Sequence, residues 1–551
     1  MKDKLDHLKW IVLFSVVTFA VFMPSSLFLG NTKEFPIGFE KVLPIILVTG
    51  GMLFLIEGGV GILFKKHEKC YFSYINLLFG VTLGFYLQGN FLNGNLPRLD
   101  GRDIVWDNWS TRAIVSATVW GICLLLPEMM LLFRVGIWNK IRKYVCIFLT
   151  SVQLLTLFVL VLTPQPDFRA AYVVTNEGEF ELGSKDNIVV FILDMLDAQY
   201  AEDYIIDDDQ YAAVFKDFVY FDNVVAGGAT TPIGVPTLLT GVTYDNPHGM
   251  SPEEYCQLAY NSSTLFKELQ ENDYTVRLFM NIEYIQYADL ENIDNIVENP
   301  TYEISSPRDF AFYLYRLTAF YAMPYQLKQY FVFYTKDFVN IVTVTGTNEG
   351  VGYSVDDPRF YHDFQEHHLS LDDHDNHFMV YHLEGAHPPY CMNENGEQVD
   401  KKNSSLEQQI HGVLKILSEY FDQMKELGIY DNSTIIVTAD HGGIGLDQNP
   451  AVFIKEAYYQ TGGSLERNSG PATFKNVRAS MAKGFLEDYS AYGASLFDDL
   501  SENIKNGRYH TTVAHLGELA LQKEPTGWDY DRYKIGDWAR DLEAVEDAEE
   551  Q

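Results

Sequence analysis

The chain has 551 residues, more than one domain of ordinary size, and a formal net charge of −35. This charge excludes nucleic acid as a partner, because a protein that neutralises phosphates needs clustered Lys and Arg. The five cysteines are too few for a disulfide framework and form no CxxC metal motif. The sequence leaves open whether Cys256 and Cys391 form a disulfide.

Five apolar stretches lie within the first 164 residues, and each has about 20 residues, enough to cross a hydrocarbon core of about 30 Å as a helix. They are Trp10–Gly30, Val42–Phe64, Cys70–Leu92, Ala113–Phe133 and Tyr144–Thr163. The first is too long for a cleaved signal peptide, and four similar stretches follow it. The sequence therefore predicts an α-helical membrane domain with five spans over residues 1–164.

The loops between these spans differ in their content of Lys and Arg. The N-terminal segment and the loops after the second and fourth spans hold ten basic residues, against five in the two alternate loops. Because basic loops stay in the cytoplasm, the N-terminus is predicted to be cytoplasmic. Five crossings then place everything after Thr163 outside the cytoplasm.

The remaining sequence is typical of a soluble protein with alternating strands and helices. After a linker over residues 165–186, apolar runs of strand length occur at Asn187–Leu193, Phe378–Leu383 and Thr434–Ala439, separated by helical stretches. Continuous apolar runs indicate strands buried on both faces of a parallel sheet, so residues 187–525 are predicted to form an α/β domain with helices flanking the sheet. Residues 526–551 are predicted to be an acidic C-terminal tail, and the stretch Asp541–Gln551 is expected to be frayed.

Each of the three strands is followed by residues that bind metals or transfer protons. Asp194 follows the first strand, His387 lies just after the second, and Asp440 and His441 follow the third. Taken singly, an Asp in such a place is more typical of a turn or a helix cap. Because ligands of open α/β sheets bind outside the carboxyl ends of the strands, these four residues are expected to converge.

A fourth element is the segment 227–241, GGATTPIGVPTLLTG. Thr231 precedes Pro232 at the predicted start of a short helix, where a hydroxyl residue often acts only as an N-cap. The same helix end also stabilises an anion, so a hydroxyl there can carry a phosphoryl group. Thr230 is the reserve nucleophile.

In this order the segments resemble the sulfatase-like branch of the alkaline phosphatase superfamily, over roughly residues 185–520. The resemblance is carried by the strand ending at Asp194, the Thr231 segment ending in LLTG, His382-x-x-x-x-His387, and Asp440-His441-Gly442. In sulfatases the nucleophile stands ten residues before the Gly of LTG, as Thr231 stands before Gly241. Five spans joined to an external domain are similar to lipoteichoic acid synthases and phosphoethanolamine transferases.

This resemblance implies a multi-pass enzyme of a bacterial cell membrane with an extracytoplasmic catalytic domain and one divalent metal ion, Mn²⁺ or Zn²⁺. By position the metal ligands are Asp194, Thr231, Asp440 and His441. The residues that hold substrate or shuttle protons are His387 and His382.

The sequence also departs from the pattern of its relatives. The first acid is usually Glu in these transferases, whereas Asp194 shortens the reach to the metal by one methylene group. Formylglycine chemistry is excluded, because it requires Cys or Ser at position 231 and Arg four residues later, where this chain has Thr231 and Val235.

Four further residues are considered for the site. Arg359 is a candidate phosphate clamp, with an ordinary surface arginine as the alternative. Asp373-x-x-x-His377 has the spacing of metal ligands but lies in a polar run and is interpreted as a solvated turn. His510 has no assignable partner in the sequence.

The predicted function is transfer of phosphoglycerol or phosphoethanolamine from a membrane phospholipid to a cell-envelope glycan or teichoic-type polymer, through a covalent phosphothreonine intermediate. The donor is assigned to the membrane because five spans exceed the needs of an anchor. Two alternatives stay open, a membrane-anchored phosphodiesterase in which water replaces the acceptor, and a non-catalytic scaffold that binds glycans or proteins.

Overall fold

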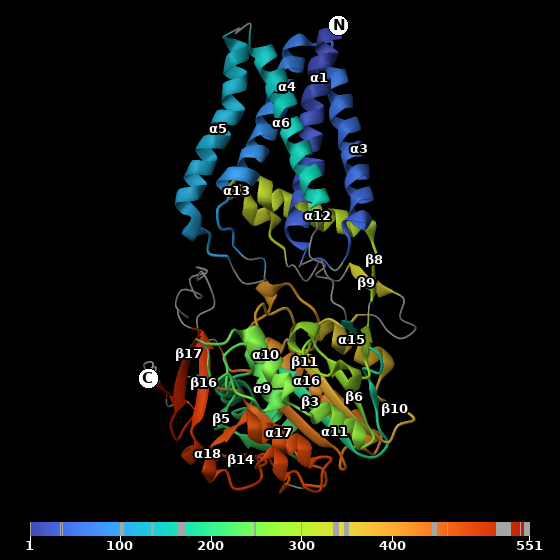
Figure 1. Cartoon of the computed structure of the whole chain (residues 1–551), viewed down its shortest axis with the longest axis vertical. Helices are drawn as coiled ribbons and strands as arrows, with labels where there is room; N and C mark the ends of the chain where they lie inside the picture. The colour runs from blue at the N-terminus through green and yellow to red at the C-terminus, as the bar shows by residue number, and fades with distance from the viewer. Residues whose placement is uncertain are drawn as a thin grey trace. The chain divides into compact units, whose positions relative to one another are not determined.

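The computed structural model divides the chain into two compact units (Figure 1). The membrane unit comprises Met1–Ala171 and Pro300–Gly346, and the sheet unit comprises Tyr172–Asn299 and Thr347–Gln551. The structure describes all residues except 1, 33–34, 36, 98, 100–103, 134–136, 164–171, 247–248, 299, 334–340, 346–351, 444–448, 460, 514–529, 540–541 and 545–551. The basic residues Lys33, Arg98, Arg102 and Arg134 of the loop comparison lie outside the described residues.

Within the described residues, the membrane unit has five helices that are long and apolar enough to cross a bilayer, which confirms the predicted number. The first is continuous through α1 (Lys2–Ser15), η1 (Val16–Phe22) and α2 (Met23–Gly30). The others are α3 (Phe39–Phe64), α4 (Glu68–Leu87) extended by η3 (Gln88–Leu92), α5 (Ser110–Leu132) preceded by η4 (Trp106–Trp109), and α6 (Trp138–Leu162).

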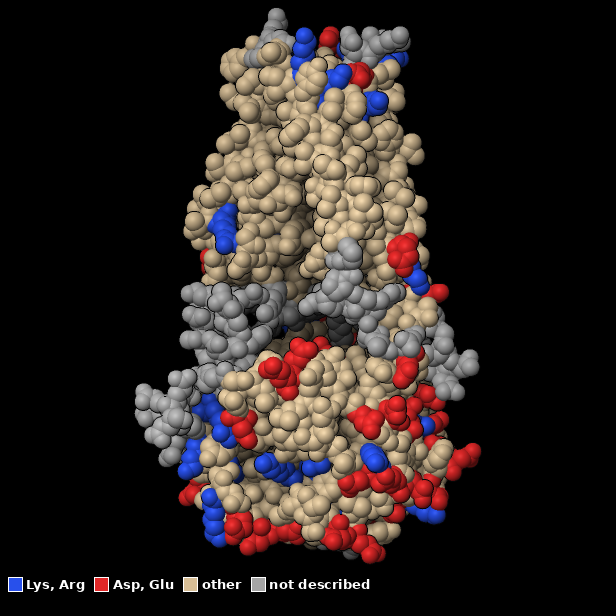
Figure 2. Space-filling view, viewed as in Figure 1, with Lys and Arg blue, Asp and Glu red and all other residues tan. Residues whose placement is uncertain are grey.

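The five membrane helices differ in how much of their side-chain surface is exposed. Most of the first helix is buried among the others, whereas the other four expose large apolar side chains such as Leu55, Leu63 and Leu132. In Figure 2 the surface of these helices is almost free of charge over most of its length, and charged residues gather at the end that holds the N-terminus. An uncharged band between charged ends is what a hydrocarbon core requires.

The membrane unit also contains an insertion from the middle of the chain. Its elements are β8 (Thr301–Ile304), α12 (Pro307–Ala322), α13 (Tyr325–Lys328), η9 (Gln329–Phe331) and β9 (Val342–Thr345). Helix α12 packs its apolar face, including Phe310 and Leu314, against the membrane helices, and the Tyr315 hydroxyl donates a hydrogen bond of 2.7 Å to the Ala20 carbonyl. This segment lies within residues 187–525, which the sequence predicts as one uninterrupted domain.

The sheet unit is built on a mixed sheet of seven strands within the described residues, in the order β14-β4-β13-β12-β3-β11-β6. The central strands β12 (Thr434–Thr438), β3 (Asn187–Leu193), β11 (Asn376–Leu383) and β6 (Tyr274–Phe279) run parallel. Strand β13 (Val452–Lys455) runs antiparallel to β12 and to β4 (Val219–Phe221), and β14 (Glu466–Asn468) completes the edge.

Helices cover both faces of this sheet, as the continuous apolar strands predicted. Every residue of β3 is buried. Val189 and Phe191 pack on the face covered by α16 (Leu406–Glu426), and the alternate residues pack on the face covered by α9 (Thr231–Thr240), α11 (Leu265–Glu271) and α17 (Phe474–Lys483). The predicted α-helical membrane domain and the predicted α/β domain with helices flanking its sheet are therefore confirmed.

The end of the chain forms a small antiparallel sheet of β16 (Arg508–Val513), β17 (Tyr530–Ile535) and β18 (Leu542–Ala544). These strands lie partly within the acidic tail expected over residues 526–551, whereas most of the stretch expected to be frayed, Asp541–Gln551, lies outside the described residues. Ile535 and Ala539 are buried against Val225, so this segment is packed despite its acidic composition.

The remaining elements of the sheet unit are short. They are β1 (Tyr172–Val174), β2 (Glu181–Leu182), α7 (Ala198–Ala201), η5 (Glu202–Ile206), α8 (Asp209–Ala212), η6 (Ala213–Phe215), β5 (Val224–Val225), α10 (Pro252–Asn261), η7 (Ile282–Tyr284), η8 (Leu290–Asn292), β7 (Ile296–Glu298), α15 (Asp357–His367), β10 (Ser370–Leu371), η10 (Lys401–Asn403), β15 (Ala472–Thr473), η11 (Ser490–Tyr492) and α18 (Ser501–Asn506).

Candidate active site

The site lies at the carboxyl ends of the central parallel strands. Strands β3 and β12 pair in register, with Ile192 opposite Thr438, so Asp194 and Asp440 emerge side by side. The backbone N–H of Met195 donates to Oδ1 of Asp440 at 3.3 Å. Met195 has a φ of 60°, a left-handed conformation that is uncommon outside glycine and that turns the chain directly after Asp194.

Thr231 is the first residue of α9, and helix α9 abuts the Asp440 turn closely. A Cβ atom at Gly234 would lie 2.1 Å from the Asp440 carbonyl oxygen, so only glycine allows this approach. The Thr231 hydroxyl is consequently 3.5 Å from Nε2 of His441, and its side chain is almost fully buried. Thr230, the reserve nucleophile, is the residue before the helix, and its buried hydroxyl has no hydrogen-bond partner among the described residues.

His441 directs one ring nitrogen at the two carboxylates. Its Nε2 is 3.4 Å from Oδ2 of Asp440 and 3.7 Å from Oδ1 of Asp194. Its Nδ1 is 2.5 Å from the Gly442 carbonyl, which can only accept a hydrogen bond. This contact assigns the proton to Nδ1 and leaves the lone pair of Nε2 pointing into the site.

The two predicted histidines, His382 in β11 and His387 after it, lie in different surroundings. His382 is buried, with Nε2 at 3.7 Å from Oδ2 of Asp194, and burial lowers its pKa, so its ring is neutral. His387 lies in the turn after β11 and is partly exposed, which suits proton exchange better. Asp357 holds that turn, because its carboxylate accepts the backbone N–H groups of Glu384 and Gly385 at 2.6 and 3.0 Å.

The neighbouring carboxylates of Asp194 and Asp440 favour binding of a cation. Burial, reinforced by the neighbouring Asp440 carboxylate, raises the pKa of Asp194 well above its ordinary value. Burial also opposes ionisation of Asp440, but His441 and His382 hold the pKa of Asp440 below its ordinary value. Oδ1 of Asp194 and Oδ2 of Asp440 are both buried without a hydrogen-bond partner among the described residues.

These residues fit a divalent metal ion. Two adjacent buried carboxylates repel each other, and a cation between them stabilises both as anions. Ligand atoms of Asp194, His382 and Asp440 all lie within 4.8 Å of one another, and Nε2 of His441 points at both carboxylates. The structure therefore brings together the four predicted ligands and adds His382 to them.

Arg359, the candidate phosphate clamp, has partners of its own near the start of α15. Its guanidinium donates to the hydroxyl and the carbonyl of Ser354 at 3.2 and 3.1 Å and lies 3.8 Å from Asp363. Binding a phosphate would require it to leave these partners. Cys256 and Cys391, whose pairing the sequence left open, form no disulfide with each other.

Sequence reasoning missed the place of His510. Strand β16 pairs with the segment before Thr231. The Thr511 N–H donates to the Gly227 carbonyl, and the Ala229 N–H donates to the Thr511 carbonyl, each at 3.0 Å. Burial, with a smaller effect of nearby His441, lowers the pKa of His510 to about 4. Its Nε2 is buried without a hydrogen-bond partner among the described residues. No sequence motif indicated this approach, because β16 pairs with a loop nearly 300 residues earlier.

Comparison with known proteins finds one family match and several similar solved structures. The family model described as sulfatase matches residues 186–466. Among solved structures, Ps i-CgsB in complex with k-i-k-neocarrahexaose is 13% identical, with coverage of 64% of this chain and 82% of that one and a TM-score of 0.40. Phosphonate monoester hydrolase SpPMH from Silicibacter pomeroyi is 14% identical, with coverage of 65% and 88% and a TM-score of 0.37. The lipoteichoic acid synthase LtaP from Listeria monocytogenes is 12% identical, with coverage of 67% and 87% and a TM-score of 0.32.

Proposed function

The chain belongs to the sulfatase family, whose model matches more than half of it, and we propose that it transfers phosphoglycerol or phosphoethanolamine from a membrane phospholipid to a glycan or teichoic-type polymer of a bacterial cell envelope. One observation carries this proposal. A threonine hydroxyl, in place of the cysteine or serine that a formylglycine sulfatase needs, lies 3.5 Å from Nε2 of His441, and the same nitrogen lies 3.4 Å from Asp440 and 3.7 Å from Asp194. A hydroxyl in this setting forms a phosphoester.

The proposed metal ligands are Asp194, Thr231, Asp440 and His441, with His382 as a further donor. A bound Mn²⁺ or Zn²⁺ would supply Lewis acidity, which lowers the pKa of a hydroxyl and neutralises charge on the phosphodiester. The two carboxylates and neutral imidazoles are hard and borderline donors that suit either ion.

In the first proposed step, the Thr231 oxygen forms a bond to phosphorus, and the bond from phosphorus to the diacylglycerol oxygen breaks. The Thr231 proton leaves to solvent, and His387 gives a proton to the departing oxygen. In the second step, the acceptor hydroxyl gives its proton to His387 and attacks phosphorus. The phosphothreonine bond breaks, and a solvent proton restores the Thr231 hydroxyl.

A groove within the membrane unit supports a lipid donor. It has a volume of about 750 Å³ and lies between α3 and the inserted segment. Val48 and Met52 of α3 line it and are more than half exposed on a membrane-spanning helix, where acyl chains are the natural solvent. Lys41 and Arg308 add positive charge to its lining, which suits a lipid phosphate.

The proposed orientation places the N-terminus in the cytoplasm and the sheet unit outside it. Its support is the excess of Lys and Arg in alternate loops. A cysteine introduced into the exposed turn after α16 tests it, because a membrane-impermeant thiol reagent applied to intact cells should label it.

Intact mass of the full-length protein in lipid nanodiscs tests the reaction. Wild type incubated with phosphatidylglycerol or phosphatidylethanolamine should gain the mass of one headgroup phosphate, whereas Thr231→Ala should gain none. Thr230→Ala is the matched control and should keep the adduct. An adduct retained in Thr231→Ala would overturn the assignment of the nucleophile.

Product analysis separates the competing functions. A headgroup phosphate transferred to an added glycan supports the transferase. The free headgroup phosphate alone, with the glycan unmodified, would establish a phosphodiesterase. No adduct and no product with either lipid, in the presence of Mn²⁺ or Zn²⁺, would favour the scaffold.

A further inference from the structure

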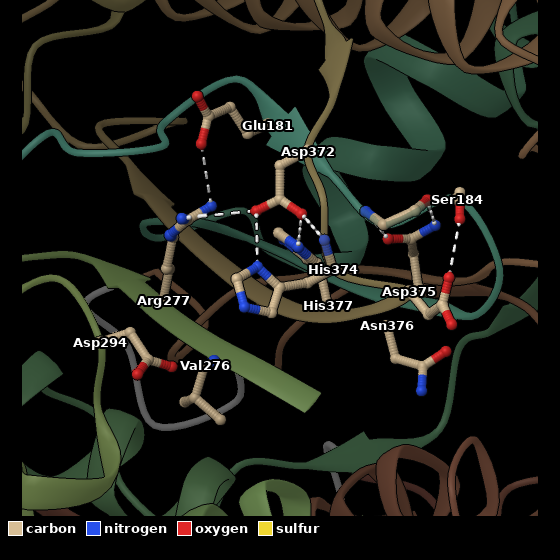
Figure 3. Close-up of polar contacts among 12 residues, drawn as sticks. Glu181, Ser184, Val276, Arg277, Asp294, Asp372, His374, Asp375, Asn376 and His377 are labelled. Atoms are coloured by element: carbon tan, nitrogen blue, oxygen red, sulfur yellow. Dashed lines mark hydrogen bonds and ion pairs between the residues drawn. The ribbon is translucent and has the colours of Figure 1, made fainter. Parts of the chain in front are cut away.

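A second group of metal-ligating side chains lies at the opposite end of the sheet. Asp372, His374 and His377, here termed the amino-edge cluster (Figure 3), precede or begin β11, whereas the candidate active site lies at its other end. The seven residues from His377 to Leu383 span about 20 Å of extended strand. The cluster is therefore separate from the candidate active site, and the proposed reaction does not use it.

The polar run that contains this cluster is exposed at Asp373, His374 and Asp375, as expected for a solvated turn, but its last residue, His377, is buried. The His377 side chain is fully buried and that of Asp372 is 12% exposed, while that of His374 is 69% exposed. His377 pairs with Thr275 of β6 and with Asn187 of β3, so it is enclosed by the first residues of neighbouring strands. Both of its ring nitrogens lack a partner in hydrogen-bond geometry among the described residues.

The spacing of the ligand atoms matches a tetrahedral zinc site. Zinc bonds of about 2.0–2.2 Å to nitrogen and oxygen place neighbouring ligand atoms about 3.4 Å apart. Nε2 of His377 is 3.0 Å from Oδ1 of Asp372, and Nδ1 of His374 is 3.5 Å from Oδ2 of the same carboxylate. One ligand atom from each of the three residues lies within 4.8 Å of the others, so small rotations of the side chains suffice.

The alternative partner of the Asp372 carboxylate is the guanidinium of Arg277. Its guanidinium lies 3.6 Å from Oδ2 of Asp372 and 3.4 Å from Glu181 (Figure 3). The distance to Asp372 exceeds that of a hydrogen bond, so Oδ2 keeps a lone pair for a cation. Carboxylates that bind metals usually have such an outer partner.

We propose that Asp372, His374 and His377 bind a zinc ion, in addition to the metal ion of the candidate active site. Two imidazoles and one carboxylate favour zinc over magnesium or calcium, and the exposed side of His374 leaves the fourth position to water. The Asp372 backbone N–H donates to the Leu182 carbonyl at 3.1 Å, so bound zinc ties the β2–β10 pair to the start of β11. The ion stabilises this edge of the sheet and takes no part in phosphoryl transfer.

The test uses full-length protein in detergent and a background that lacks the other metal. Asp440→Asn removes a ligand of the candidate active site without changing the shape of the side chain. This variant is stripped with chelator, dialysed against Zn²⁺, and analysed for bound zinc by mass spectrometry of the element. We expect one zinc per chain, and adding His374→Ala should remove it, with at least a 100-fold loss of affinity.

His362→Ala is the matched control, because His362 is also an exposed histidine beside an aspartate, at 3.2 Å from Asp363. It should leave zinc content unchanged. His374 is exposed, so its replacement should preserve folding, and zinc should raise the unfolding temperature of the Asp440→Asn protein only when His374 is present. Zinc content that His374→Ala does not lower, or that His362→Ala lowers equally, would overturn the proposal. These readouts do not depend on phosphoryl transfer.

Discussion

Gly234→Ala tests whether the approach of α9 to the Asp440 turn creates the site. Alanine is the better helix former by about 1 kcal/mol, so local propensity alone predicts a more stable protein. In the structure, however, the added Cβ would lie 2.1 Å from the Asp440 carbonyl oxygen, against 3.4 Å for ordinary contact. Because the obstacle is backbone, α9 or the turn must move by about 1.3 Å, the difference of these distances.

A displacement of this size should disrupt the site more than the fold. Overpacking of a core costs about 1–3 kcal/mol, which exceeds the gain in propensity. A misplacement of about 1 Å between reacting groups costs roughly 100-fold in rate. Gly234→Ala should therefore lower formation of the headgroup-phosphate adduct by about that factor and lower the unfolding temperature.

The assay is single-turnover adduct formation by intact mass, with thermal unfolding measured on the same preparation. Gly121→Ala in helix α5 is the matched control, because a Cβ there meets no atom within 4 Å. It should retain activity and stability. Activity of Gly234→Ala within threefold of wild type, with an unchanged unfolding temperature, would refute the dependence of the site on this contact.

Three further predictions concern pH, metal and lipid. Burial raises the pKa of Glu179 to about 8, so the unfolded chain releases this proton from about pH 4.5 and the folded chain does not. The free energy of unfolding should therefore fall as pH rises from 4.5 to 8, by at most roughly 5 kcal/mol. Glu179→Gln should remove this loss, as measured by urea unfolding at pH 8. Chelation should abolish adduct formation and lower the unfolding temperature, and Mn²⁺ or Zn²⁺ should restore both in wild type but not restore activity in Asp440→Asn; activity that survives exhaustive chelation would contradict the metal requirement. Val48→Trp should fill the groove and raise KM for lipid donor severalfold without changing kcat, whereas equal KM values would exclude the groove from donor binding.

Much of the architecture is local enough to be predicted from the sequence. The five spans follow from the length of apolar stretches, because a bilayer requires about 20 apolar residues whatever the tertiary structure. The strands β3, β11 and β12 follow from apolar runs that only a sheet covered on both faces can bury. Asp194, Asp440 and His441 follow from the rule that parallel strands present their carboxyl ends at one edge.

Other features depend on partners distant in the chain. The insertion with α12 joins the membrane unit because its apolar face packs on α2 and α3, yet an amphipathic pattern does not name its partner. Strands β17 and β18 have polar sequences, YDRYKI and LEA, and form by pairing with β16. Composition alone therefore predicted an acidic tail where backbone pairing with β16 forms strands.

The sequence by itself determined the kinds of residue available to the site and the strand ends that carry them. Only the tertiary structure decided that His382, predicted for substrate or proton transfer, lies among the candidate metal ligands, that His510 lies near His441 and that His377 is buried. Burial and proximity arise when segments far apart in the chain pack together, and they alter the pKa and the reach of each side chain. A residue type and its spacing report the chemistry a group can do, whereas its neighbours in space decide which chemistry it is placed to do.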